Sequence, residues 1–232
     1  MFFYSPNYGF GSGMIFVIPA IIFALYAQAK VKATFAKYLH VGSSKGYTGA
    51  EVARIILDKN GLFDVNVESV GGYLSDHYDP RNKVLRLSPQ VYGGNSLASI
   101  SVAAHEAGHA MQHGRGYIPL NLRNTIAPIA NFGSKSVWIL VFGAFILGIP
   151  QLIDLGILLY LCAVIFQVIT LPVEFNASSR AIEQLEMNGM ISQQEIVPSK
   201  KVLNAAALTY VAAMAVSLAQ LLRLIMLRNR RR

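Results

Sequence analysis

The sequence predicts a mainly α-helical membrane protein: transmembrane helices, plus a small α+β part in which a β-hairpin precedes a helix carrying His-Glu-x-x-His. Of its 232 residues, 53% are hydrophobic and 14% are charged, whereas soluble domains contain roughly 25% charged residues. Apolar segments long enough to cross a bilayer alternate with polar segments. The polar segments contain the alternating and turn-forming patterns that are typical of short strands.

The formal net charge of +8 indicates contact with the lipid bilayer, because basic residues set membrane topology and bind anionic lipid. These residues are scattered or adjoin apolar segments, so no nucleic-acid partner is expected. The single cysteine, Cys162, lies in an apolar segment. No disulfide can form within the chain, which is consistent with a reducing compartment.

Residues 12–29 are expected to form a transmembrane anchor. This segment is long enough to span, and it lacks the basic start and small-residue cleavage site of a signal peptide. Lysine follows it at positions 30, 32 and 37, and no basic residue precedes it. This asymmetry predicts an amino terminus outside the cell and a cytoplasmic location for the segment that follows.

Residues 30–130 are expected to form the α+β part. Thr48-Gly-Ala-Glu51 predicts the capping box of a helix that ends at Asn60-Gly61. The hydrophobic alternation at 65–70 predicts a short strand. A connector is expected between the anchor and this helix, at residues 33–47.

A β-hairpin is expected from residues 73–78 and 83–88, because Asp79-Pro-Arg-Asn82 between them is a turn signal. Ser96 is then the expected N-cap of a helix that runs to about His113.

The second half of the chain is expected to form a transmembrane hairpin at 131–173, a polar helix at 174–198, a membrane helix at 199–227 and a basic tail at 228–232. The last membrane helix has two interpretations. If it spans and the polar part is cytoplasmic, its basic tail lies outside. Alternatively it lies along the interface, with Arg223 and the tail on anionic headgroups.

His105, Glu106 and His109 form the His-Glu-x-x-His pattern. Residues four apart share one face of a helix, so the two imidazoles can hold one metal ion between them. Glu106 is offset by about 100° and can reach a water on that metal. The alternative is the polar face of an ordinary helix, whose histidines donate to backbone carbonyls.

A catalytic zinc site usually takes a third protein ligand, and two residues are candidates. His113 follows on the same helical stripe, but three successive stripe positions span about 12 Å at 1.5 Å per residue. Glu174 is preferred because the transmembrane hairpin returns it to the side of the metal helix, and Ala177 and Ala181 leave room for close packing. The alternative for Glu174 is a surface carboxylate that the helix dipole favours.

Ala104-His-Glu-Ala-Gly-His-Ala110, a membrane hairpin and Glu174-Phe-Asn-Ala-Ser178 resemble the membrane zinc peptidases of the gluzincin type. Nearly the whole chain is similar to a bacterial family described as putative neutral zinc metallopeptidases (YugP-type). Further shared segments are Thr48-Gly-Ala-Glu-Val-Ala53, Leu74-Ser-Asp-His-Tyr-Asp-Pro80, Arg86-Leu-Ser88, Val91-Tyr92 and Val173-Glu-Phe-Asn-Ala-Ser178.

The resemblance implies a zincin-like fold for the α+β part and one Zn²⁺ per chain, bound by His105, His109 and Glu174, with Glu106 as the catalytic base. The resemblance also implies a bacterial protein. Together with the apolar segments and the lysines that flank them, this predicts a multi-pass protein of the plasma membrane with its active site on the cytoplasmic side. Ser178 stands where many gluzincins have an aspartate that orients a metal-binding histidine, so a weaker hydrogen bond is expected there.

The expected function is that of a membrane-anchored zinc metallopeptidase, an endopeptidase that cleaves peptides or proteins, membrane proteins included. His77, Tyr78 and Arg180 are candidates for contacts with the substrate or the transition-state oxyanion. The alternative for each is a surface or turn residue.

Two other functions stay open. In one, a site-2-like intramembrane protease, the metal helix lies in the bilayer; the polar hairpin before it argues against this. The other is a non-catalytic, zinc-stabilised membrane scaffold or adaptor. Glu106 argues against that, because a structural zinc site needs no base.

Overall fold

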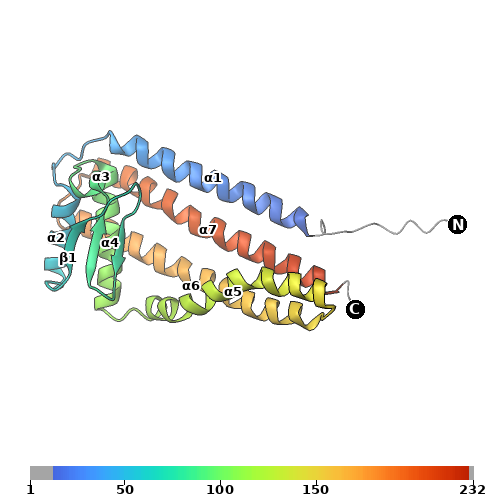
Figure 1. The fold of residues 1–232 in the computed structure, drawn as a ribbon. Coiled ribbons are helices and arrows are strands. Elements are labelled where there is room, and N and C mark those ends of the chain that lie inside the picture. Colours follow the sequence, from blue (N-terminus) through green and yellow to red (C-terminus); the bar gives the residue numbers. More distant parts are fainter. Residues whose placement is uncertain (1–12, 230–232) are drawn as a thin grey trace. The chain divides into compact units, whose positions relative to one another are not determined.

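The computed structural model describes residues 13–229, most of which are helical, with three short strands in one small sheet (Figure 1). The predicted mainly helical fold is therefore confirmed. The first residue of the expected anchor and the end of the basic tail lie outside the described residues.

Within residues 13–229, four helices are long and apolar enough to cross a membrane: α1 (Met14–Leu39), α5 (Ile118–Leu147), α6 (Gln151–Met187) and α7 (Gln193–Asn229). Each extends beyond the apolar segment that predicted it. α1 continues through the lysines into the expected connector, and α6 runs without a break into the residues expected to form a separate polar helix.

Proline does not end these helices, and α7 runs through residues 198 and 199, where the sequence suggested a boundary between a polar helix and a membrane helix. Pro128, Pro172 and Pro198 lie inside α5, α6 and α7. A proline removes one backbone hydrogen bond and crowds the preceding turn, but packing against neighbouring elements can outweigh that cost. In α6 and α7, a change between apolar and polar sequence therefore does not mark a helix end. It lies within one continuous helix.

The described chain divides into two compact units. The first, the helical unit, consists of residues 13–26, 123–168 and 210–229. Its core contains Val137, Val141 and Leu224, and the guanidinium of Arg223 lies 5.1 Å from the ring centre of Trp138. Such a cation–π contact accommodates a largely buried arginine within an apolar unit.

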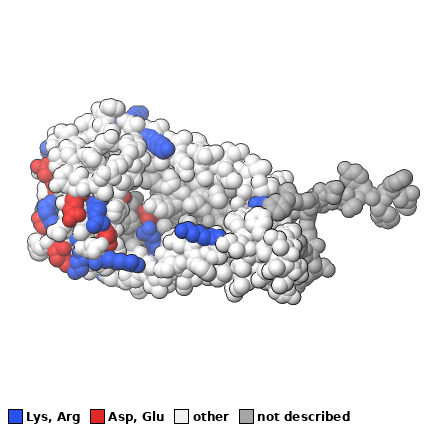
Figure 2. Space-filling view, in the orientation of Figure 1, with Lys and Arg blue, Asp and Glu red and all other residues white. Residues whose placement is uncertain are grey.

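The second, the mixed unit, consists of residues 27–122 and 169–209. It contains α2 (Gly49–Lys59), β1 (Asn66–Ser69), β2 (His77–Asp79), β3 (Val84–Leu87), α3 (Pro89–Tyr92) and α4 (Leu97–Gly114), together with parts of α1, α6 and α7. Figure 2 shows most of the charged side chains in that view over this unit, in keeping with its polar sequence.

The sheet has the strand order β1-β3-β2. β2 and β3 pair antiparallel, which confirms the predicted hairpin, although β2 is shorter than the segment 73–78 suggested. β1 pairs with β3 in parallel, so α4 follows a three-stranded sheet and not an isolated hairpin.

Two helices of the mixed unit begin with the side-chain caps that the sequence predicts. The Thr48 hydroxyl accepts from the Glu51 amide, and the Glu51 carboxylate accepts from the Thr48 amide. At the start of α4, the Ser96 hydroxyl accepts from the Ser99 amide at 3.1 Å. These caps fix where the chain enters α2 and α4.

α4 lies in the core of the mixed unit. Its alanines Ala103, Ala104 and Ala107 are fully buried, and the surrounding core side chains include Ile56, Leu85, Leu87, Ile100 and Leu185. Small residues along α4 let its neighbours approach closely, which is the packing expected around a helix that must hold buried polar groups in place.

α6 is one of the elements that approach α4 closely. A Cβ atom added to Gly108 of α4 would lie 2.7 Å from the carbonyl oxygen of Ala177, which is itself fully buried. Only a glycine permits this distance between the two helices. Gly108 therefore sets the depth at which α6 packs on α4.

Gly108→Ala should push α6 away from α4 and lower the free energy of unfolding by about 1–3 kcal/mol, the usual cost of overpacking. Thermal unfolding of the purified chain in mild detergent measures this. Gly143→Ala is the matched control, because the added Cβ there meets only Leu152 at an ordinary 3.5 Å. Equal unfolding temperatures for the two variants would contradict the assignment.

Candidate metal centre

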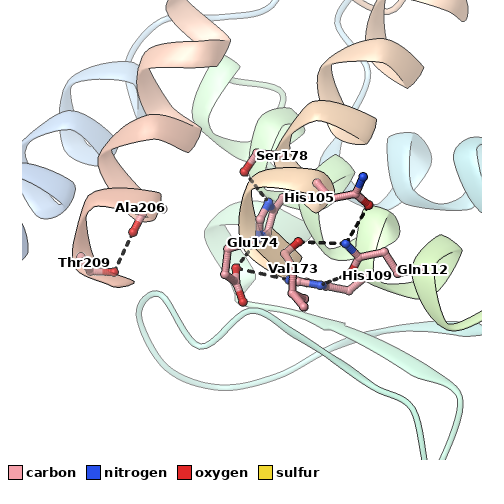
Figure 3. A network of polar contacts seen from close by, with 9 residues as sticks. His105, His109, Gln112, Val173, Glu174, Ser178, Ala206 and Thr209 are labelled. Atoms are coloured by element: carbon pink, nitrogen blue, oxygen red, sulfur yellow. Dashed lines mark hydrogen bonds and ion pairs between the residues drawn. The ribbon is translucent and has the colours of Figure 1, made fainter. Parts of the chain in front are cut away.

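Helices α4 and α6 bring two imidazoles and one carboxylate together within the mixed unit (Figure 3). The Glu174 Oε2 atom lies 3.3 Å from His105 Nε2 and 3.5 Å from His109 Nε2. Each of the three residues offers one ligand atom, and these atoms lie within 4.8 Å of one another. The two rings stand nearly perpendicular, at 85°, and both Nε2 atoms lie within 3.5 Å of the same carboxylate oxygen.

The electrostatics of this cluster favour an added positive charge. The Glu174 side chain is only 2% exposed, and the histidine side chains are 13% and 12% exposed. Burial alone would lower the pKa of His109, but the hydrogen bond with Glu174 and its negative charge outweigh burial and raise that pKa. A buried carboxylate requires a compensating cation, which protonated imidazole or a metal ion can supply.

The opposite nitrogen of each imidazole contacts a side-chain oxygen. His105 Nδ1 lies 3.2 Å from Ser178 Oγ, and His109 Nδ1 lies 3.1 Å from Gln112 Oε1. When Nδ1 carries the proton and donates it to this oxygen, Nε2 presents its lone pair toward Glu174. Metal-binding histidines are typically oriented by such contacts. Two imidazoles and a carboxylate are also a common ligand set of catalytic zinc, so the residues fit this ion.

Gln112 is a site residue that the sequence analysis missed. Its side chain is fully buried, and its amide group donates to the Val173 carbonyl at 2.8 Å and to Asn176 Oδ1 at 3.0 Å. Through these bonds α6 holds the residue that contacts His109. The available signal was its spacing, since Gln112 follows His109 by three residues on the same helical face and Asn176 follows Glu174 by two.

Glu106 lies on α4 beside the two histidines. It is 9% exposed, its carboxylate forms no hydrogen bond with another described residue, and its charge acts on His109. A carboxylate without a fixed hydrogen-bond donor is able to accept a proton from a water molecule.

The other three predicted residues contact neither the clustered imidazoles nor the Glu174 carboxylate, although Arg180 shares the Asn176 acceptor with Gln112. The Tyr78 hydroxyl lies 2.9 Å from His113 Nδ1, the His77 ring contacts the Ser75 carbonyl, and Arg180 Nε donates to Asn176 Oδ1 at 2.7 Å. Burial, together with nearby aspartates, raises the pKa of Tyr78 to about 12, so this phenol stays protonated at neutral pH. Within the described chain, no hydrogen bond joins His77, Tyr78 or Arg180 to the three clustered side chains.

The sequence matches the family described as "Putative neutral zinc metallopeptidase" over residues 13–229, which is nearly the whole chain. This chain belongs to that family. It is also 54% identical over 217 residues to a Bacillus subtilis (strain 168) protein named "Putative membrane protease YugP", an alignment that covers 92% of this chain and 96% of that relative. No solved structure matches this chain.

Replacing Gln112 should weaken zinc binding without removing a ligand. Gln112→Met keeps the side-chain volume but leaves the His109 ring without its oxygen partner, so a 10- to 100-fold loss of zinc affinity is expected. Chelator competition measures it.

The matched control is Gln184→Met on α6, which removes another buried amide whose Oε1 accepts from Asn60. If both variants lose zinc affinity equally, Gln112 affects zinc binding only by stabilising the fold, and the orientation of His109 by Gln112 is contradicted.

Proposed function

We propose that this chain is a membrane-anchored zinc endopeptidase whose mixed unit is a zincin-like catalytic part. The observation that carries the proposal is the convergence of His105, His109 and Glu174 from two helices. Membership of a zinc peptidase family and similarity to a protein named as a membrane protease support the same conclusion.

His105, His109 and Glu174 would hold the ion, and Ser178 and Gln112 would keep the two imidazoles in orientation. Zinc bound there would polarise the scissile carbonyl and lower the pKa of water toward 7. Glu106 accepts the proton of the attacking water and passes it to the leaving amine, which is general base and then general acid catalysis.

The peptide substrate would lie along the hairpin. β2 is at one edge of the sheet, where an extended peptide can add as a further strand. His77 and Tyr78 lie on β2 and stay candidates for substrate contact. Arg180, which lies near Glu174 on α6, stays a candidate for contact with the oxyanion after substrate binding.

Cleavage beside the bilayer is favoured over cleavage within it. α4 is not among the four helices that are apolar enough to span, and its alanine face is buried in the core of the mixed unit. The lysines at 30, 32 and 37 and at 200 and 201 adjoin apolar segments on the polar side, which supports a cytoplasmic active site.

Glu106→Gln should retain one zinc per chain but lose proteolysis by about 10²–10⁴-fold, because the amide cannot accept the proton. The measurement pairs metal content with cleavage of an unfolded soluble protein such as casein by the full-length chain in detergent. A chelator should abolish the wild-type activity, and added zinc should restore it.

Glu183→Gln is the control, because it removes an exposed carboxylate of α6 that is not among the three clustered side chains. Wild-type activity in Glu106→Gln would refute the catalytic role. Normal zinc content with no activity in either the wild type or the control would favour a zinc-stabilised scaffold.

A further inference from the structure

A cavity of the mixed unit, of about 540 Å³, lies between α1 and α7. Residues of α1 line one wall and residues of α7 line the other: Lys30, Thr34, Lys37, Tyr38, Lys201, Asn204, Ala205 and Leu208. Since the three metal-site residues are not among them, this cavity is separate from the candidate metal centre.

The lining residues are spaced as one face of each helix. On α1 they follow the pattern i, i+4, i+7, i+8, and on α7 the pattern i, i+3, i+4, i+7. Lys32 of α1 and Lys200 of α7 do not line the cavity. The three lining lysines therefore converge through helical periodicity, whereas their neighbours in the sequence point elsewhere.

The cavity is strongly cationic. Three ammonium groups line it, and no acidic residue among the described residues does. Thr34 and Asn204 add neutral hydrogen-bond donors, and the Lys37 ammonium lies 5.6 Å from the ring centre of the buried Tyr38. Lysine clusters with hydroxyl and amide donors are the chemistry that binds phosphate groups.

The position of the lysines along their helices indicates which kind of phosphate-containing molecule the cavity would bind. On α1 the apolar segment ends at Ala29, one residue before Lys30, and on α7 the apolar segment begins at Val202, one residue after Lys201. Ala205 and Leu208 make one end of the cavity wall apolar. A phosphate beside apolar surface at the end of two membrane helices matches a phospholipid.

We propose that this cavity binds the headgroup of an anionic phospholipid, with its phosphate between Lys37 and Lys201. Asn204 also lines a neighbouring cavity of about 400 Å³, which includes Ser178, the residue in contact with His105. A bound lipid would therefore lie next to the cavity that Ser178 lines.

The test measures the binding of short-chain phosphatidylglycerol and phosphatidylcholine to the full-length protein in mild detergent, by native mass spectrometry. Lys37→Gln combined with Lys201→Gln should weaken phosphatidylglycerol binding about 25-fold, about fivefold for each lysine. The matched control, Lys32→Gln with Lys200→Gln, removes the same charge from the same helices outside the cavity. Replacing Lys37 and Lys201 with arginine should retain binding.

The proposal is supported if Lys37→Gln with Lys201→Gln loses phosphatidylglycerol binding while the control and the arginine variant keep it. Equal loss in the control would mean that diffuse surface charge binds the lipid, and equal binding of phosphatidylcholine would mean that charge is not recognised. Inorganic phosphate is the second probe. If it binds as tightly as phosphatidylglycerol, the cavity is a free-phosphate site and the lipid proposal fails.

Discussion

The close contact between α4 and α6 is the interaction on which the candidate site depends. Gly108 leaves no side chain between the helices, and the carbonyl of Ala177 fills that space. Glu174 lies one helical turn before Ala177, so the same contact places its carboxylate beside the two imidazoles of α4. His105 and Glu174 are 69 residues apart in the sequence, and the contact between Gly108 and Ala177 brings them together.

α6 contributes more than a ligand. Ser178, one turn beyond Glu174, contacts His105 directly, and the Val173 carbonyl and Asn176 hold Gln112 against His109. Both histidines are thus oriented by groups that α6 supplies or fixes. Metal affinity and ligand geometry should therefore depend on one helix–helix interface, since a shift of α6 would disturb the carboxylate and both imidazoles together.

The sequence predicts the elements better than it predicts their connections. The caps at Thr48 and Ser96, the β2–β3 hairpin and the four apolar helices follow from local patterns. The parallel pairing of β1 with β3 and the continuity of α6 through Pro172 depend on tertiary packing, which local propensity does not encode. In the site, helical spacing predicts His105 and His109 as ligands and places Gln112 beside His109. Its hydrogen bond to a backbone carbonyl 61 residues away is a tertiary contact, which spacing does not predict.

Zinc stoichiometry in two single variants tests the central claim, that α6 supplies the third ligand. His113 is the competing candidate on α4, and its Nδ1 lies 2.9 Å from the Tyr78 hydroxyl. Metal analysis of the purified full-length protein should find one zinc per chain in the wild type and in His113→Ala, and a large loss in Glu174→Ala. Retention of zinc in Glu174→Ala together with its loss in His113→Ala would contradict the account.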